Sequence, residues 1–208
     1  SGLRVGLLDQ ADTLDPDSTL GASLVGDQAD HEWASNPRIR DVVDGLVSDI
    51  SWDATISGLS GGQRRRVQLA ALLIGEWDVI CLDEPTNHLD VEGITWLARH
   101  LQQRWARNTG ALLVVTHDRW FLDEVATTTW EVHDGKVDSY EGGYAAFVLA
   151  KAERPLVWVG GALANAGAGT LEELRLLAEQ WVLPVSPTHR RPQLFDAGHP
   201  NYGGYMGI

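Results

Sequence analysis

Two short apolar runs with an amphipathic stretch between them constrain the fold of this chain more than any other feature. Residues 79–82 (VICL) and 112–115 (LLVV) each have the length of a strand, and each runs directly into polar residues. Between the runs, apolar side chains recur at helical spacing, at Ile94, Leu97, Ala98, Leu101 and Trp105. This alternation predicts an α/β fold whose parallel strands are buried on both faces.

Similar patterns extend in both directions along residues 1–154. We expect a strand at 3–9, weak helical segments at 19–34 and 38–48, a helix after Gly61-Gly62 with Val67, Ala70, Ala71 and Ile74 on its apolar face, a helix at 119–126, a hairpin turn at 133–136 and a helix at 144–153. The hairpin rests on the Asp-Gly turn signal, and the helices rest on apolar periodicity.

Residues 155–208 predict a separate βαβ unit. Its expected parts are a strand at 156–161, a helix that begins with a Thr170–Glu173 capping box and carries Leu171, Leu174, Leu177, Ala178 and Trp181, and a strand at 182–186. Charge changes at the same place, because residues 155–208 hold 3 basic and 4 acidic side chains, which leaves 13 and 25 for residues 1–154. We therefore expect domains at 1–154 and 155–208.

Composition excludes several classes of protein. The chain has 208 residues and a net charge of −13, which disfavours generic nucleic-acid binding by phosphate neutralisation. No run approaches the roughly 18 apolar residues of a membrane helix, and the first residues, SGLRVGLLDQ, do not resemble a secretion signal. The single cysteine, Cys81, excludes an internal disulfide, and we expect it to be an inert core thiol. A cytoplasmic location follows as an expectation.

The segment Leu59-Ser60-Gly61-Gly62-Gln63 lies at the start of a predicted helix. Two glycines allow a ligand to approach the backbone closely, and a helix N-terminus offers unpaired N–H groups and a positive dipole end. The Ser60 hydroxyl adds a donor, so the segment suits a terminal phosphate. The same residues are equally typical of a serine-capped helix after a glycine turn.

Acidic and imidazole side chains follow the two predicted strands. Asp83 and Glu84 end the first, where ligand sites of open α/β sheets lie, so one carboxylate can hold Mg²⁺ and the other can polarise a water. A solvated acidic turn before Pro85 is the alternative. His117 ends the second strand and can hydrogen-bond a phosphate, although a lone histidine more often has no such role.

The order of these motifs resembles the ATP-binding cassette (ABC) ATPases. Gln10 is followed by LSGGQRRRVQLA (59–70), VICLDEPTNHLD (79–90) and VVTHDRWFLDEV (114–125). The resemblance implies a P-loop-type cassette that binds and hydrolyses ATP with Mg²⁺. It also implies catalytic roles for Glu84 and His117 and metal binding by Asp83 and Gln10. The implied nucleotide-binding residues are Gln10, Ser60, Gly61, Gly62, Gln63 and Asp90. Of these, Ser60 to Gln63 form the family's signature motif, which acts on ATP held by an opposite cassette.

Two segments resemble the ABC-F group of cassette proteins, which act on ribosomes. They are DEPTNHLD (83–90) and WEVHDGKVDSYEGGYAAFVLAKAER (130–154), and they imply the ribosome as a partner. The chain departs from the family because it contains no G-x-x-x-x-G-K-[ST] phosphate loop (Walker A). We therefore expect a truncated cassette that is inactive alone and that needs a second cassette, or a missing N-terminal piece supplied in trans.

Residues 155–208 resemble the start of the central domain of thiamine-diphosphate enzymes of the acetolactate synthase type. The resemblance implies a partial Rossmann-like scaffold, which binds FAD in some members. Gly160-Gly161 and Gly167-x-Gly169 do not form G-x-G-x-x-G, so a tight turn is favoured and we expect neither FAD nor thiamine diphosphate here. Two unlike pieces suggest a chimera, with exposed edges that favour association or aggregation.

Other interpretations stay open at this point. The chain can be a non-catalytic binding or scaffold module in which the motifs are vestigial, or its tail can define it as a thiamine-diphosphate or FAD-enzyme scaffold. Arg64-Arg65-Arg66 can hold phosphate or ribosomal RNA, although a solvated helix face is favoured. His31-Glu32 lacks the second histidine of a zinc motif, so a surface helix is expected there.

Overall fold

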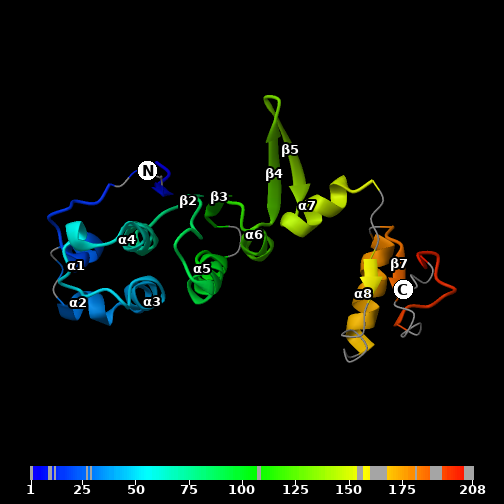
Figure 1. The fold of residues 1–208 in the computed structure, drawn as a ribbon, viewed down its shortest axis with the longest axis horizontal. Helices are drawn as coiled ribbons and strands as arrows, with labels where there is room; N and C mark the ends of the chain where they lie inside the picture. The colour runs from blue at the N-terminus through cyan, green and yellow to red at the C-terminus, as the bar shows by residue number, and fades with distance from the viewer. Residues whose placement is uncertain are drawn as a thin grey trace. The chain divides into compact units, whose positions relative to one another are not determined.

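The computed structural model describes residues 2–8, 11, 13–26, 28, 30–106, 109–153, 157–159, 168–180, 182–187 and 194–203 (Figure 1). The chain divides into two compact units, Ser1–Phe147 and Val148–Ile208, and the division falls within helix α7 (Tyr144–Lys151). No helix in these ranges combines the length and apolar character needed to cross a bilayer.

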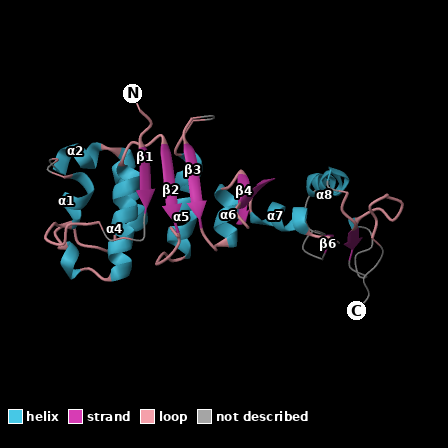
Figure 2. Ribbon diagram, turned by 90° about the horizontal axis from the view of Figure 1, so that it is seen from above, coloured by secondary structure: helices cyan, strands magenta, loops and turns pink. Residues whose placement is uncertain are grey.

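A three-stranded parallel sheet organises the first unit. Strand β2 (Val79–Asp83) lies between β1 (Val5–Leu8) and β3 (Ala111–Val115). Cys81 pairs in register with Leu7 on one side and Leu113 on the other. Figure 2 shows the strands side by side and pointing the same way. The predicted α/β fold with parallel strands is confirmed.

Most helices of the first unit begin at a residue whose side chain caps them. The helices of this unit are α1 (Leu20–Val25), α2 (Asp30–Ser35), α3 (Pro37–Leu46), η1 (Ile56–Gly58), α4 (Gly61–Ile74), α5 (Val91–Gln103) and α6 (Arg119–Val125). Five of them are capped by a side-chain oxygen that accepts a backbone N–H of the first turn. The capping residues are Thr19, Asn36, Ser60, Asp90 and Asp118. The segment expected at 19–34 divides because α1 ends at Gly26, whose φ is 63°.

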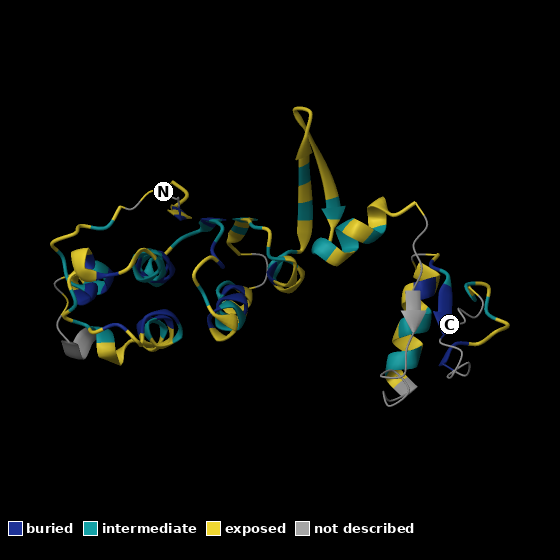
Figure 3. Cartoon of the chain, viewed as in Figure 1, coloured by how far each residue is buried: buried dark blue, intermediate teal, exposed yellow. Residues whose placement is uncertain are grey.

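The core of this unit lies between the helices and one face of the sheet. Leu8, Ile80 and Leu82 project from the strands, and helices α4 and α5 supply Val67, Ala70, Leu73, Leu97 and Leu101. Figure 3 shows the buried residues on the sides of α4 and α5 that face the strands. The i, i+3, i+4 pattern of the sequence therefore faces the sheet as predicted.

The opposite face of the sheet is open within the ranges that the structure describes. Its exposed fractions are 54% at Val5, 64% at Leu7, 44% at Leu113 and 59% at Val115. The prediction that β3 is buried on both faces is therefore wrong, because α4 and α5 both pack on the other side. Cys81 lies on this open face and is half-buried, so it is not the core thiol that the sequence predicted.

A long hairpin follows α6. Strands β4 (Thr128–His133) and β5 (Lys136–Glu141) pair antiparallel. Asp134 and Gly135 have φ values of 48° and 72°, which a two-residue hairpin turn of the favoured hand requires. The predicted Asp-Gly turn is confirmed, and most of the hairpin is exposed (Figure 3).

The second unit contains one βαβ motif, as predicted. Strands β6 (Val157–Val159) and β7 (Val185–Pro187) pair in parallel, with α8 (Ala168–Gln180) between them in the sequence. The buried apolar residues of its described part are Ala178, Leu183, Val185, Leu194 and Phe195. Helix α8 begins before Thr170, so the predicted start at a Thr170–Glu173 capping box is wrong. Gly160, Gly161 and Gly167 lie outside the described residues.

Candidate functional site

The carboxyl ends of β2 and β3 bring two of the predicted site residues into contact. Glu84 directly follows β2, and His117 lies two residues beyond the end of β3. Because the strands are parallel and adjacent, their ends meet at one edge of the sheet. The Nδ1 atom of His117 lies 2.9 Å from Oε2 of Glu84. The fold therefore assembles an acid–imidazole pair from residues 33 positions apart.

The backbone at Glu84 is held in an uncommon conformation. Its φ is 47°, a left-handed value that a residue with a side chain rarely adopts. Its N–H donates to the carbonyl oxygen of Val115 over 2.8 Å, which ties the loop to the end of β3. Such strain persists only where surrounding bonds hold it, and it often accompanies a functional residue.

Hydrogen bonds keep the Glu84 carboxyl ionised. Burial raises its pKa, but hydrogen bonds from His117 and from Thr116 outweigh that effect, so the pKa lies below its usual 4.5. The Thr116 hydroxyl donates to Oε2 of Glu84 over 3.1 Å. The hydrogen bond to Glu84, reinforced by its charge, raises the pKa of the exposed His117 above the usual 6.5. The pair thus favours a carboxylate beside an imidazolium.

Helix α4 starts with the glycine-rich segment. Ser60 Oγ accepts the N–H of Gln63 over 3.2 Å, and the Gln63 side chain accepts the N–H of Ser60 over 3.0 Å. These two bonds form a capping box, so the Ser60 oxygen acts as a helix cap, which is one of the two interpretations of this segment. The hydroxyl hydrogen is not used in that bond, and the helix still presents its first N–H groups at Gly61 and Gly62.

A hollow of about 470 Å³ joins this helix start to Glu84. Its walls are Gly61, Gly62, Arg64, Arg65, Gln68, Glu84, Asn87 and His88. Gly62 approaches the loop after β2 so closely that a Cβ there would lie 3.3 Å from Cβ of His88. The glycine therefore lets the helix start and the acidic loop line one polar space, as an anionic ligand would require.

The three arginines of α4 bind the protein itself. Arg64 donates to the Leu59 carbonyl over 3.0 Å, and Arg65 donates to the Asp83 carbonyl over 2.7 Å. Arg66 makes two bonds to the Asp49 carboxylate, at 2.6 and 2.7 Å. The favoured interpretation, a solvated helix face, is therefore wrong, because these side chains connect α4 to its neighbours. The partners of Arg65 and Arg66 lie 18 and 17 residues away in the sequence, so the run of charges could not reveal them.

The remaining predicted residues occupy separate positions. Asp83 ends β2 and presents a carboxylate at the same sheet edge. Asp90 caps α5 by accepting the Gly93 N–H over 2.8 Å at its Oδ1. Gln10 lies outside the described residues, and so do the side chains of His31 and Glu32. The structure thus brings Glu84 together with His117, and with Gly61 and Gly62 around the hollow.

Two threonines belong to the site although sequence reasoning did not select them. Thr116 binds Glu84, and it also accepts the N–H of Asp118 over 3.2 Å. Thr86 is buried, and its hydroxyl lies 3.5 Å from that of Thr116. The position of Thr116 beside His117 at a strand end was the available signal. Together with Asp83 and Glu84 they offer hard oxygen donors, the ligand type that Mg²⁺ prefers.

Two family models match separate parts of the chain. The ABC transporter model matches residues 1–87, and the thiamine pyrophosphate enzyme central-domain model matches residues 144–208. ATP-binding protein ChvD of Rhizobium radiobacter is 49% identical over 102 residues, which cover 49% of this chain and 34% of ChvD. This chain contains an ABC ATPase-like domain.

Further relatives of the ABC ATPase-like domain agree. The energy-dependent translational throttle protein EttA of Mycobacterium tuberculosis is 43% identical over 130 residues, which cover 62% of this chain and 22% of EttA. The archaeal ribosome recycling factor aABCE1, solved in complex with ribosomal stalk protein aP1, superposes with a TM-score of 0.57 at 26% identity, over 71% of this chain and 29% of the factor. The chain thus spans about a third or less of each of these proteins.

Proposed function

We propose that the first part of this chain is one side of an ATP-hydrolysing site of the ABC type. The contact between Glu84 and His117 at the carboxyl edge of the sheet carries the proposal. An ionised carboxylate there can accept a proton from the water that attacks the terminal phosphate. The cationic His117 can hydrogen-bond an oxygen of the phosphate that is transferred. ABC ATPases combine these groups with Mg²⁺.

The other site residues support binding rather than proton transfer. Asp83 would hold Mg²⁺, with Gln10 as its expected second contact, and the ion would neutralise charge on the phosphates. Ser60, Gly61, Gly62 and Gln63 would bind the terminal phosphate of a nucleotide held by a second cassette, through the α4 N-terminus and the Ser60 hydroxyl. Asp90 would contact that cassette. The phosphate loop would come from outside the 208 residues, whose sequence contains none.

Equilibrium binding of Mg-ATP and its turnover test this proposal. The purified chain, its Glu84→Gln variant and a Gln102→Ala control would be compared, because Gln102 bonds Glu124 rather than any site residue. Binding below about 100 μM, or about −5.5 kcal/mol, with turnover that only Glu84→Gln abolishes supports the proposal. Because the phosphate loop is expected from outside these residues, the same three proteins are also assayed with a cassette fragment that supplies such a loop. Absence of Glu84-dependent turnover in that mixture, or turnover that survives Glu84→Gln, contradicts the proposal.

A non-catalytic binding module is the second candidate. The lack of a G-x-x-x-x-G-K-[ST] loop in this sequence favours it, because that loop cradles the phosphates of a bound nucleotide. In that case the site residues are vestigial and the chain acts only through partners. The binding and turnover measurements separate the two candidates, since a module of this kind shows no turnover that depends on Glu84.

The ribosome is the partner that the relatives suggest. The names of EttA and aABCE1 refer to translation and to ribosome recycling, and the ABC-F resemblance points the same way. Action on ribosomes would also agree with the expected cytoplasmic location. Co-sedimentation with ribosomes, compared between the chain and buffer-exchanged bovine serum albumin, tests this partner. A pellet fraction no larger than that of albumin would contradict it.

The open sheet face is the part of the first unit that we expect to drive association. Val5, Leu7, Leu113 and Val115 expose apolar surface on β1 and β3, the two strands that flank β2. Light scattering coupled to size-exclusion chromatography should show a molar mass that rises with protein concentration. The double variant Leu113→Lys, Val115→Lys should have a lower molar mass at the same concentration. A concentration-independent monomer mass would contradict this expectation.

The second unit is proposed to be a scaffold fragment of the thiamine-diphosphate enzyme type, joined to the cassette as a chimera. The family-model match at residues 144–208 and the β6–α8–β7 motif support this. We expect no bound FAD or thiamine diphosphate, so the purified protein should lack flavin absorbance near 450 nm, and a yellow protein would contradict that. Limited proteolysis should cut within about 148–160, and a resistant core that spans this range would argue against two joined pieces.

A further inference from the structure

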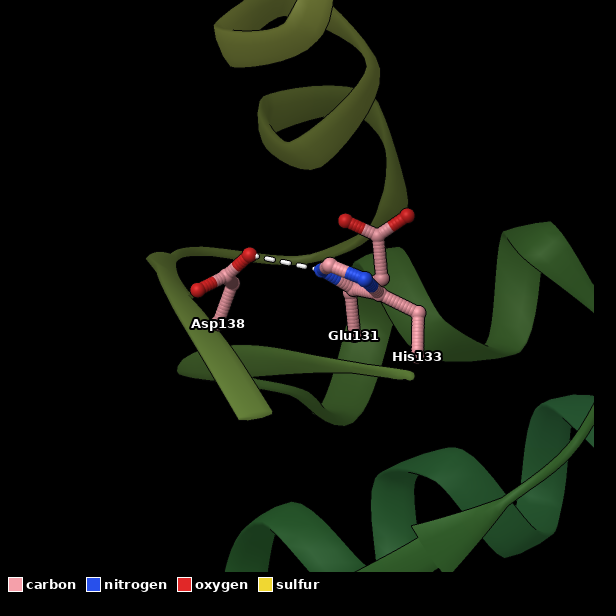
Figure 4. A group of neighbouring side chains, drawn as sticks. All are labelled: Glu131, His133 and Asp138. Carbon is pink, nitrogen blue, oxygen red and sulfur yellow. Dashed lines mark hydrogen bonds and ion pairs between the residues drawn. The ribbon is translucent and has the colours of Figure 1, made fainter. Parts of the chain in front are cut away.

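Three potential metal ligands share one face of the β4–β5 hairpin. The antiparallel register pairs Glu131 with Asp138, and His133 follows Glu131 by two residues, so all three project from the same face. One nitrogen or oxygen from each residue lies within 4.8 Å of the others (Figure 4). The shortest approach, 2.8 Å, is between Nε2 of His133 and Oδ2 of Asp138.

The charges of this face favour a cation. Glu131 and Asp138 lie directly opposite each other across the strands, and like charges in that arrangement repel. A third carboxylate, that of Asp134, approaches Nδ1 of His133 to 3.6 Å. Lys136, opposite His133, is the one basic side chain paired on this face of the hairpin. A divalent ion between the carboxylates would relieve the repulsion more fully than one imidazolium can.

We propose that Glu131, His133 and Asp138 bind a divalent transition metal such as Zn²⁺. Imidazole together with carboxylates favours zinc, cobalt or nickel over magnesium or calcium, which prefer oxygen ligands alone. Three protein ligands leave further coordination positions for water, as in open zinc sites. The side chains of His133 and Asp138 are 43% and 54% exposed, so an ion can enter without unfolding the hairpin.

The surroundings orient two of the three ligands. With Nε2 of His133 on the metal, its Nδ1 faces the Asp134 carboxylate, the arrangement that commonly supports a ligating histidine. The Tyr140 hydroxyl donates to Oε2 of Glu131 over 3.3 Å. The Tyr140 ring packs edge-on against Phe147, with centroids 5.1 Å apart. These contacts reduce the side-chain entropy that metal binding must overcome.

Calorimetric titration with Zn²⁺ tests the site, and ATP plays no part in the measurement. The purified chain should bind one Zn²⁺ equivalent at this site, and His133→Ala should weaken that binding at least about tenfold. Glu131→Gln and Asp138→Asn should weaken it also. His199→Ala is the matched control, because His199 contacts one carboxylate, that of Glu179 at 3.1 Å, and is expected to leave the affinity unchanged.

Paramagnetic Co²⁺ provides the second readout and locates the ion. It should broaden the amide NMR signals of residues 128–141 in the 208-residue chain. His133→Ala should remove the effect while circular dichroism shows an unchanged fold. Binding that His133→Ala does not change, broadening centred elsewhere, or adventitious binding that the His199→Ala control lowers equally would overturn the proposal.

Discussion

The two compact units differ in how much core supports them. The first unit has one continuous cluster of buried side chains from its sheet and helices, whereas the buried apolar residues described in the second are Ala178, Leu183, Val185, Leu194 and Phe195. The candidate site residues that the structure describes all lie on elements that pack into the larger cluster. A site that must hold atoms within a fraction of an ångström needs such support. The comparison thus favours the first unit as the part that carries chemistry.

The ion pairs of the two units differ in the same direction as their cores. In the first, ion pairs connect distant elements, as between Arg66 of α4 and Asp49 after α3. In the second, Arg175 pairs with Glu172 and Glu179 on its own helix. The contact of His199 with Glu179, at 3.1 Å, joins α8 to the described segment after β7. Pairs within one exposed helix contribute only about 0.3–0.5 kcal/mol each. The second unit therefore depends on its few core residues, and removal of one of them should be decisive.

Phe195→Ala should produce the largest effect, loss of the folded second unit. Truncation of a buried phenylalanine costs about 3–5 kcal/mol. A unit of roughly 60 residues has about 3–9 kcal/mol in total at typical stabilities per residue. Hydrogen exchange should show α8 (168–180) fully exchanging while peptides from α4 and α5 stay protected. Equal loss of protection in both units would show that their stabilities are coupled.

Leu73→Ala tests the other side of the comparison. Leu73 is fully buried in the first unit, so the substitution should lower the unfolding free energy by about 2–5 kcal/mol. At the same stability per residue, the first unit has about 7–22 kcal/mol and should remain folded. Urea unfolding followed by tryptophan fluorescence measures the change. Leu176→Ala, at a half-exposed position of α8, is the control and should shift the midpoint little.

These differences also explain how much the sequence could predict. The strands at 79–83 and 111–115 and the helices α4 and α5 follow from local periodicity, and Asp134-Gly135 determined the hairpin. The open face of β3 was not predictable, because burial depends on which elements cover a sheet. The strand-end positions of Glu84 and His117 predicted one site, but their contact depends on the φ of Glu84, which no pattern reveals.

Contacts between distant residues were the main failure. The partners of Arg64, Arg65 and Arg66 depend on how α4 packs, and Asp49 lies 17 residues from Arg66. The Glu131–Asp138 pairing is different, since a two-residue turn at Asp134-Gly135 requires it. The positions of Glu131, His133 and Asp138 on one face of the hairpin therefore follow from the sequence, because the turn determines the register.

Ser60→Ala should have a smaller effect than either core substitution. The capping box at the start of α4 contributes about 1 kcal/mol, which alanine removes. Ser60→Asp restores the cap acceptor but places a negative charge where a phosphate would bind. If Ser60 only caps the helix, aspartate should recover both stability and any Mg-ATP binding. Recovery of stability with loss of ATP binding would show that the phosphate binds beside Ser60, where the added carboxylate repels it.

The smallest expected effect is a pH dependence of stability that is confined to the first unit. The His100 side chain is nearly buried between α3 and α5, where it stacks on Trp96 and its Nδ1 lies 3.0 Å from the Asp41 carboxylate. Burial lowers its pKa below the usual 6.5, with Arg104 and Arg38 acting in the same direction and Asp41 opposing them. The unfolded chain therefore binds a proton more readily than the folded chain.

The sign of the pH dependence follows from that difference. The His100 contribution to the unfolding free energy is fully present above pH 6.5 and is lost as the pH falls from 6.5 toward the lower pKa of the folded state. Between pH 7.5 and 5.5 the urea midpoint should therefore fall relative to that of His100→Gln, which can still donate to Asp41 but does not titrate. The raised pKa of His117 acts in the opposite direction, but it does so in both proteins and cancels in this comparison. Hydrogen exchange at pH 5.5 should show the difference in α3 and α5, and an equal response in α8 would mean that the two units do not respond separately.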